Sequence, residues 1–184
     1  MNFLNLVRNR QSVRQYSNKP VEREKIERCL EAARLAPSAS NRQPWEFIVI
    51  DNPQVKEAVA GKTFSKLIFF NRFSLQAPIL IVIISERESM INKIGKRLKD
   101  KPFTLIDIGI AAENICLQAT ESGLGTCILG WFDEKGVKEV LAIPQSNRIE
   151  LIITMGYPES EVIRPKKRKE LDQIRSYNQY KLKK

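Results

Sequence analysis

Residues 103–122 read FTLIDIGIAAENICLQATES, and this stretch decides how the chain is expected to fold. At helical spacing its apolar residues reach nearly every side, while Gly123-Leu124-Gly125 supplies a helix end. A helix that is apolar nearly all round must be buried on most sides. The sequence therefore predicts a long helix at the centre of a domain or at a contact between subunits.

The surrounding segments supply a sheet and its covering helices. Ile79 to Ile84 is apolar without alternation, which predicts a strand covered on both faces. Further strands are expected at 47–50, 126–129 and 149–155, and further helices at 2–9, 22–36, 53–60 and 134–141. Helices and strands alternate with helices dominant, which predicts an α/β sandwich: a mixed central sheet flanked by helices.

Size and composition indicate one folded unit. The chain has 184 residues, of which 42% are hydrophobic, so we expect a single domain over 1–184 with 159–184 as an extended basic tail. The longest apolar run, 77–84, is too short to cross a bilayer, and the first residues lack the order of a signal peptide. A soluble cytoplasmic protein that does not engage a membrane is therefore expected.

The chain contains three cysteines and no histidine. Cys29, Cys116 and Cys127 form no CxxC pair and lie in apolar stretches, so buried structural thiols are expected. Without histidine the chain cannot use Ser-His-Asp or Cys-His catalysis or a histidine-based metal site, and no metal is expected. Chemistry must come from carboxylates, lysines or a cofactor.

The net charge of +10 raises nucleic acid as a possible partner. Residues 164–184 hold nine basic and two acidic side chains, so +7 falls in the tail and +3 in all the rest. A basic nucleic-acid-binding module remains an alternative, but no aromatic and basic residues interleave. We therefore expect no nucleic-acid partner.

The first candidate site is Arg10, Ser12 and Arg14, which follow the first predicted helix. In an extended segment these alternate residues project to one side. Two guanidinium groups and a hydroxyl there could bind a phosphate, since arginine donates in a planar, bidentate geometry. A solvated loop whose arginines pair with surface carboxylates is an equally good interpretation.

Two further segments have compositions that suit a flat polar ring. Residues 37–45 read PSASNRQPW, in which small hydroxyl residues precede two amides that can both donate and accept. An ordinary helix-to-strand loop has the same composition. Gly130 ends the strand 126–129, and glycine there permits close approach of a ligand to the backbone.

Taken together, these motifs resemble the nitroreductase family of FMN-dependent oxidoreductases. The resemblance lies in the order and spacing of Arg10-x-Ser12-x-Arg14, the PSASNRQPW segment, 124–130, 155–158 and Lys166-x-Arg168, and it extends from about Leu6 to Leu171. It implies a homodimer with two FMN sites in the interface, helix 103–122 at much of the contact, and a C-terminal tail that wraps the partner.

The resemblance also assigns roles to the motifs. It implies that Arg10, Lys166 and Arg168 meet the FMN phosphate, while Gln11, Ser12 and Arg14 reach the ribityl chain and the pyrimidine edge. The backbone N–H groups of Leu129 and Gly130 would lie near flavin N5. A loop of the second protomer would complete the site with Pro37, Ser38, Ala39, Asn41 and Gln43.

The implied reaction needs no catalytic side chain. Hydride would pass from NAD(P)H to flavin N5 and then to a small organic acceptor, such as a nitroaromatic or a quinone, with ping-pong kinetics. Dehalogenation, flavin destruction and heterocycle oxidation on the same fold stay open, as does the choice between NADH and NADPH. Glu86 to Lys101 is where substrate-lining elements are expected, and Asn71 is a further candidate flavin contact.

Overall fold

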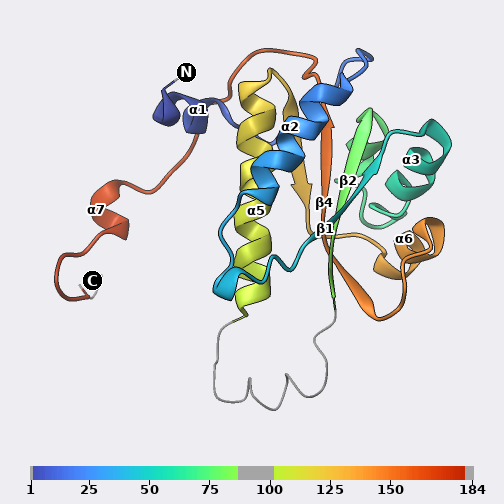
Figure 1. Ribbon diagram of the computed structural model, residues 1–184. Coiled ribbons are helices and arrows are strands. Elements are labelled where there is room, and N and C mark those ends of the chain that lie inside the picture. Colours follow the sequence, from blue (N-terminus) through green and yellow to red (C-terminus); the bar gives the residue numbers. More distant parts are fainter. Residues whose placement is uncertain (1, 87–101, 181–184) are drawn as a thin grey trace.

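The computed structural model describes residues 2–86 and 102–180, and in that part of the chain a four-stranded sheet lies between helical layers (Figure 1). The strands stand in the order β1 (Glu46–Ile50), β2 (Ile79–Glu86), β4 (Asn147–Gly156), β3 (Gly125–Leu129). All three neighbouring pairs are antiparallel. Beyond β3, Ser12 forms an isolated parallel bridge to Thr126. The predicted sheet flanked by helices is confirmed; its four described strands are antiparallel, and the parallel pairing expected of a mixed sheet is represented by the Ser12 bridge.

Strand β2 is buried on both faces, as its continuous apolar run predicts. Leu80, Val82 and Ile84 contribute to one hydrophobic cluster. Ile79, Ile81 and Ile83 contribute to a second cluster. Successive strand residues point to opposite faces, so one strand supports both halves of the core.

Each face of the sheet has its own pair of helices (Figure 1). On one side lie α2 (Arg23–Arg34) and α5 (Phe103–Glu121), and on the other lie α3 (Pro53–Ala60) and α6 (Glu134–Leu141). A short α1 (Phe3–Asn9) precedes them. Side-chain caps fix the starts of α3 and α6, because the Asn52 side chain accepts from the backbone N–H groups of Gln54 and Val55, and Asp133 accepts from that of Gly136.

Helix α5 is buried on most sides but keeps one apolar face exposed. Ile108, Ala112 and Ile115 are at most 1% exposed. By contrast, Phe103, Ile106 and Ile110 are 37–48% exposed. The helix is thus apolar on two faces, one packed in the core and one that the described residues leave partly exposed.

Three short elements have no counterpart in the sequence-based prediction. They are the 3₁₀ turns η1 (Ala39–Asn41) and η2 (Arg72–Leu75) and the four-residue α7 (Leu171–Ile174). Segments this short carry no hydrophobic period from which they could be recognised.

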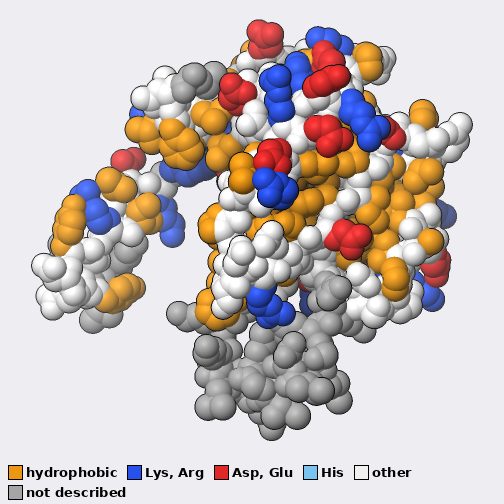
Figure 2. Space-filling model, viewed as in Figure 1, with side chains coloured by type: hydrophobic (Ala, Val, Ile, Leu, Met, Phe, Trp, Pro, Cys, Tyr) orange, Lys and Arg blue, Asp and Glu red, His pale blue; other side chains and the backbone are white. Residues whose placement is uncertain are grey.

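The C-terminal segment first follows the body and then leaves it. Glu159 N donates to the carbonyl of Gln15, and the chain then passes α1 before α7 projects outward (Figure 1). Hydrophobic side chains are visible on the projecting part (Figure 2). Among the described residues, no helix is long and apolar enough to cross a membrane. The substrate-lining element expected at 86–101 lies outside the described residues, apart from Glu86 at the end of β2.

Candidate functional site

The loop after α1 is fixed as an extra edge segment beside β3. Val13 N donates to the carbonyl of Thr126 at 2.8 Å, next to the Ser12 bridge. Gly125 allows this close approach, since a Cβ there would lie 2.5 Å from a methyl carbon of Val13. The backbone of β3 therefore sets the position of Arg10 to Arg14.

Arg10 carries a donor without an acceptor. Its Nε lies 3.1 Å from a carboxylate oxygen of Glu113 on α5, which makes an ion pair. The N–H is nevertheless buried and has no hydrogen-bond partner among the described residues. Glu113 therefore balances the charge of Arg10, although the geometry of their contact is not that of a hydrogen bond.

Lys166 brings the tail to the same place. The Lys166 ammonium donates to the carbonyls of Val7, Arg8 and Arg10 at 2.7, 2.5 and 2.5 Å, and so it caps the C-terminal end of α1. Partial burial lowers the pKa of Lys166, and the positive charges of Arg10 and Arg168 lower it further. The expected approach of the tail to the Arg10 loop is therefore seen for Lys166, with Arg168 two residues further along the chain and Glu113 as the opposite charge.

Gln11 fastens the tail to this loop. Its Nε2 donates to the carbonyl of Val162 at 3.0 Å, and its Oε1 accepts from the N and Nε of Arg164 at 3.2 and 3.1 Å. Arg164 also donates to the carbonyl of Ser12. A Gln11 contact to the ribityl chain, as the family resemblance implies, would require these hydrogen bonds to be given up.

Arg14 and Ser12 face other parts of the fold. The Arg14 guanidinium lies 5.8 Å from the centre of the Phe73 ring. Burial raises the pKa of the neighbouring Cys127 thiol, although Arg14 and a hydrogen bond with Ser12 act in the opposite direction. Arg10 and Arg14 thus have different partners, Glu113 and Phe73, within the chain.

The loop 37–43 is attached to the first half of α5. Ala39 N donates to both carboxylate oxygens of Asp107 at 3.2 Å, and Gln43 N donates to Ser38 Oγ at 2.9 Å. The Gln43 side chain donates to Asn41 at 3.2 Å. Pro37, Asn41 and Gln43 remain exposed. Their polar groups are therefore available to a ligand or a second chain.

The loop 37–43 and Arg10 contact different sides of α5, through Asp107 and Glu113 respectively. Asp107 and Glu113 are six residues apart, which is about 9 Å along a helix and about 120° around it. Within one chain, α5 therefore stands between the two groups.

The end of β3 offers open backbone. Leu129 is buried and paired with Ile152, while Gly130 is exposed, and a Cβ there would meet nothing within 4 Å. The next residue is held in place, because Asn71 Nδ2 donates to the carbonyl of Trp131 at 3.0 Å. Asn71 itself is 5% exposed, so it supports this strand end from below the surface.

Comparison with known proteins gives a consistent result. A family model described as "Nitroreductase family" matches residues 7–72 and 69–157. A protein of Archaeoglobus fulgidus, provisionally named NADH dehydrogenase/NAD(P)H nitroreductase, is 32% identical over 86% of this chain and 86% of its own. An iodotyrosine deiodinase of Thermotoga neapolitana is 24% identical over 84% of this chain and 87% of its own.

Solved structures agree over nearly the whole chain. A nitroreductase family protein from Clostridium novyi NT superposes with a TM-score of 0.78 at 29% identity, covering 90% of this chain and 89% of its own. An FMN-dependent nitroreductase from Clostridium difficile R20291 superposes with a TM-score of 0.72 at 30% identity, covering 98% of both chains.

Proposed function

The chain belongs to the nitroreductase family, and from that premise we propose that it is an FMN-dependent oxidoreductase. It takes hydride from NAD(P)H and passes it to a small organic acceptor, a nitroaromatic compound or a quinone. Reductive dehalogenation is the second candidate, because one relative is named a deiodinase. The proposed place of action is the cytoplasm, where NAD(P)H is available.

The approach of Lys166 to the Arg10 loop, with Arg168 two residues further along the tail, is the observation that carries this proposal. Partial burial lowers the pKa of Lys166, the positive charges of Arg10 and Arg168 lower it further, and Glu113 acts in the opposite direction. Glu113 offsets one of these positive charges, and the phosphate of FMN would add negative charge and accept hydrogen bonds from the guanidinium groups of Arg10 and Arg168. The residues present therefore fit a phosphomonoester.

The rest of the proposed site comes from the ring-facing groups. FMN, when bound, supplies the N5 atom that accepts and donates hydride. Gly130 has no side chain to obstruct a flat ring. We propose that the backbone N–H groups of Leu129 and Gly130 donate to the edge of that ring. Arg14 and Ser12 would hold the pyrimidine edge and the ribityl chain. The positive charge of Arg14 would stabilise negative charge there.

A second copy of the chain completes the proposed site. Pro37, Ser38, Ala39, Asn41 and Gln43 lie across α5 from Arg10, so we propose that they serve the FMN of the partner. The exposed face of α5, formed by Phe103, Ile106 and Ile110, is the proposed dimer contact. Burying such an apolar face is the main driving force of subunit association.

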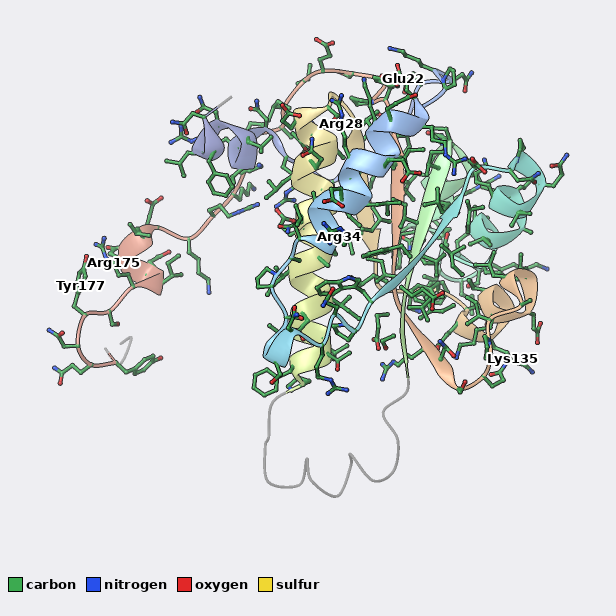
Figure 3. The ribbon with its side chains drawn as sticks, viewed as in Figure 1. Glu22, Arg28, Arg34, Lys135, Arg175 and Tyr177 are labelled. Atoms are coloured by element: carbon green, nitrogen blue, oxygen red, sulfur yellow. The ribbon has the colours of Figure 1, made fainter. Side chains whose placement is uncertain are left out.

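The projecting end of the chain has a place in this dimer. Leu171, Ile174 and Tyr177 are 60–69% exposed, and Arg175 and Tyr177 stand away from the body (Figure 3). We propose that this C-terminal arm lies on the partner subunit, which would cover these side chains.

A visible spectrum tests the proposed activity. The purified protein, loaded with FMN, should show flavin bands that bleach when NADH or NADPH is added under nitrogen. A nitroaromatic compound or a quinone should then restore the bands. Arg10→Gln should retain less FMN, whereas Lys135→Gln, which removes an equal charge from the outer side of α6, should not (Figure 3). Protein that takes up no FMN would refute the proposal, and salt-sensitive binding to DNA or RNA would then support the alternative.

A further inference from the structure

A groove of about 470 Å³ opens on the segment that joins α3 to β2, outside the site described above. Two aromatic rings and an aliphatic side chain form its apolar part, and two cations and a hydroxyl form its polar part. The lining residues are Phe64, Phe69, Leu75, Lys66, Arg72 and Ser65. Phe69 is 70% exposed, so one ring presents its surface to solvent.

The charge in this groove is of one sign. Lys66 and Arg72 are both exposed, and neither forms an ion pair with a carboxylate among the described residues. The described lining residues include no aspartate or glutamate. Two unneutralised cations beside an open aromatic ring favour a ligand that is both anionic and aromatic.

The frame of the groove is tied to the core, although its surface is open. Thr63 and Ser74 are fully buried, and their hydroxyl groups share a hydrogen bond of 2.8 Å. Lys56 Nζ donates to the carbonyl of Leu75 at 2.7 Å. These contacts hold both ends of the segment, so the aromatic and cationic side chains stand on a supported backbone.

The opposite side of the same segment supports the end of β3. Asn71 hydrogen-bonds the carbonyl of Trp131, and the Phe70 and Trp131 rings lie 6.2 Å apart. Arg72, one residue beyond Asn71, lines the groove. The groove and the support for the strand end thus belong to one short segment, on its two sides.

We propose that this groove binds the adenosine phosphate half of the nicotinamide dinucleotide that reduces the flavin. The inference rests on the proposed function, which requires such a donor. In a dinucleotide the adenine is remote from the nicotinamide, and phosphate groups lie between them. A donor whose nicotinamide reaches the flavin must place those anionic and aromatic parts on neighbouring surface. Phe69 stacks on the adenine, and Lys66 and Arg72 bind phosphate.

Rapid-mixing kinetics of flavin reduction test this subsite. The FMN-loaded enzyme is mixed under nitrogen with NADH, with NADPH, or with reduced nicotinamide mononucleotide, which lacks the adenosine phosphate half. The Kd for each donor is taken from the dependence of the bleaching rate on donor concentration. The variants are Lys66→Gln, Arg72→Gln and Phe69→Ala, with Lys135→Gln as the control for lost charge.

The expected result is specific to the dinucleotides. Each charge variant should raise their Kd by up to about fivefold, as expected for an exposed ion pair. Phe69→Ala should raise it by at least about fivefold through lost stacking. The Kd for the mononucleotide should not change. An effect on NADPH alone would place the cations at the 2′-phosphate, and an equal effect on NADH would place them at the 5′-phosphate on the adenosine side of the pyrophosphate.

Two outcomes would overturn the inference, and they differ from failure of the proposed function. If the variants leave both dinucleotides unaffected, or weaken the mononucleotide equally, the groove does not hold the adenosine half. Reduction of the flavin by the mononucleotide would still leave the proposed function intact. If no donor bleaches the flavin, the proposed function itself fails.

Discussion

Replacing Gln11 by alanine should release the C-terminal segment from the body of the protein. The change removes the hydrogen bonds to Val162 and Arg164, which are the side-chain contacts that Gln11 makes among the described residues. Each such bond contributes about 0.5–1.5 kcal/mol net. These groups are exposed and water can replace their partners. We therefore expect the free energy that holds the segment closed to fall by about 1–2 kcal/mol in total. That corresponds to an opened population about 5–30 times larger.

Limited proteolysis measures this opening. Trypsin can cleave after the basic residues 166–169, and the rate follows the opened population when the segment recloses faster than it is cut. Gln15→Ala is the matched control, because Gln15 contacts Glu159 through its backbone carbonyl, which the variant keeps. If the two variants were cut at equal rates, the Gln11 side chain would not fasten the tail.

Three further changes test the fold and the proposed dimer. Ile106→Glu, on the exposed face of α5, should give a folded monomer by sedimentation velocity; an unchanged dimer would contradict the proposed contact. Gly125→Ala should lower the free energy of unfolding by about 1–3 kcal/mol in urea, because its Cβ would overlap Val13. Burial tends to raise the pKa of Glu134, but hydrogen bonds from Lys138 and the Ile149 backbone lower it overall. The contribution of Glu134 to the free energy of unfolding is therefore present above the ordinary pKa of a glutamate, and it is lost as the pH falls through the lowered pKa. Glu134→Gln should thus lower the free energy of unfolding by about 1–3 kcal/mol at pH 7, since buried Lys138 loses its counter-charge. The difference from the unsubstituted protein should shrink in acid, and a difference that stays constant with pH would contradict this.

The long apolar segments made most of the fold predictable from the sequence. Strand β2 lacks alternation because it separates two cores. Helix α5 lacks a polar face, and its partly exposed apolar side is the proposed dimer contact. In both segments an apolar run marked an element that is covered on most sides, and the length of the run distinguished the strand from the helix.

The partners of polar side chains were less predictable. Gln11 can donate and accept, so its sequence position alone does not distinguish a ligand contact from a bond to the tail. Lys166 caps α1, and a helix C-terminus always offers carbonyls to a nearby cation. That rule could have suggested the contact, but only with knowledge that the tail returns to α1. The groove at Phe69 was missed because its residues carry no motif.

The affinity for FMN relative to riboflavin tests the central claim most directly, since the two flavins differ only in the phosphate. If Arg10 and Arg168 both bind it through charge-assisted hydrogen bonds, FMN should bind at least about 100 times more tightly. Arg10→Gln and Arg168→Gln should each reduce that ratio, while Lys135→Gln should preserve it. Equal affinity for the two flavins, or a ratio that neither arginine substitution changes, would contradict the account.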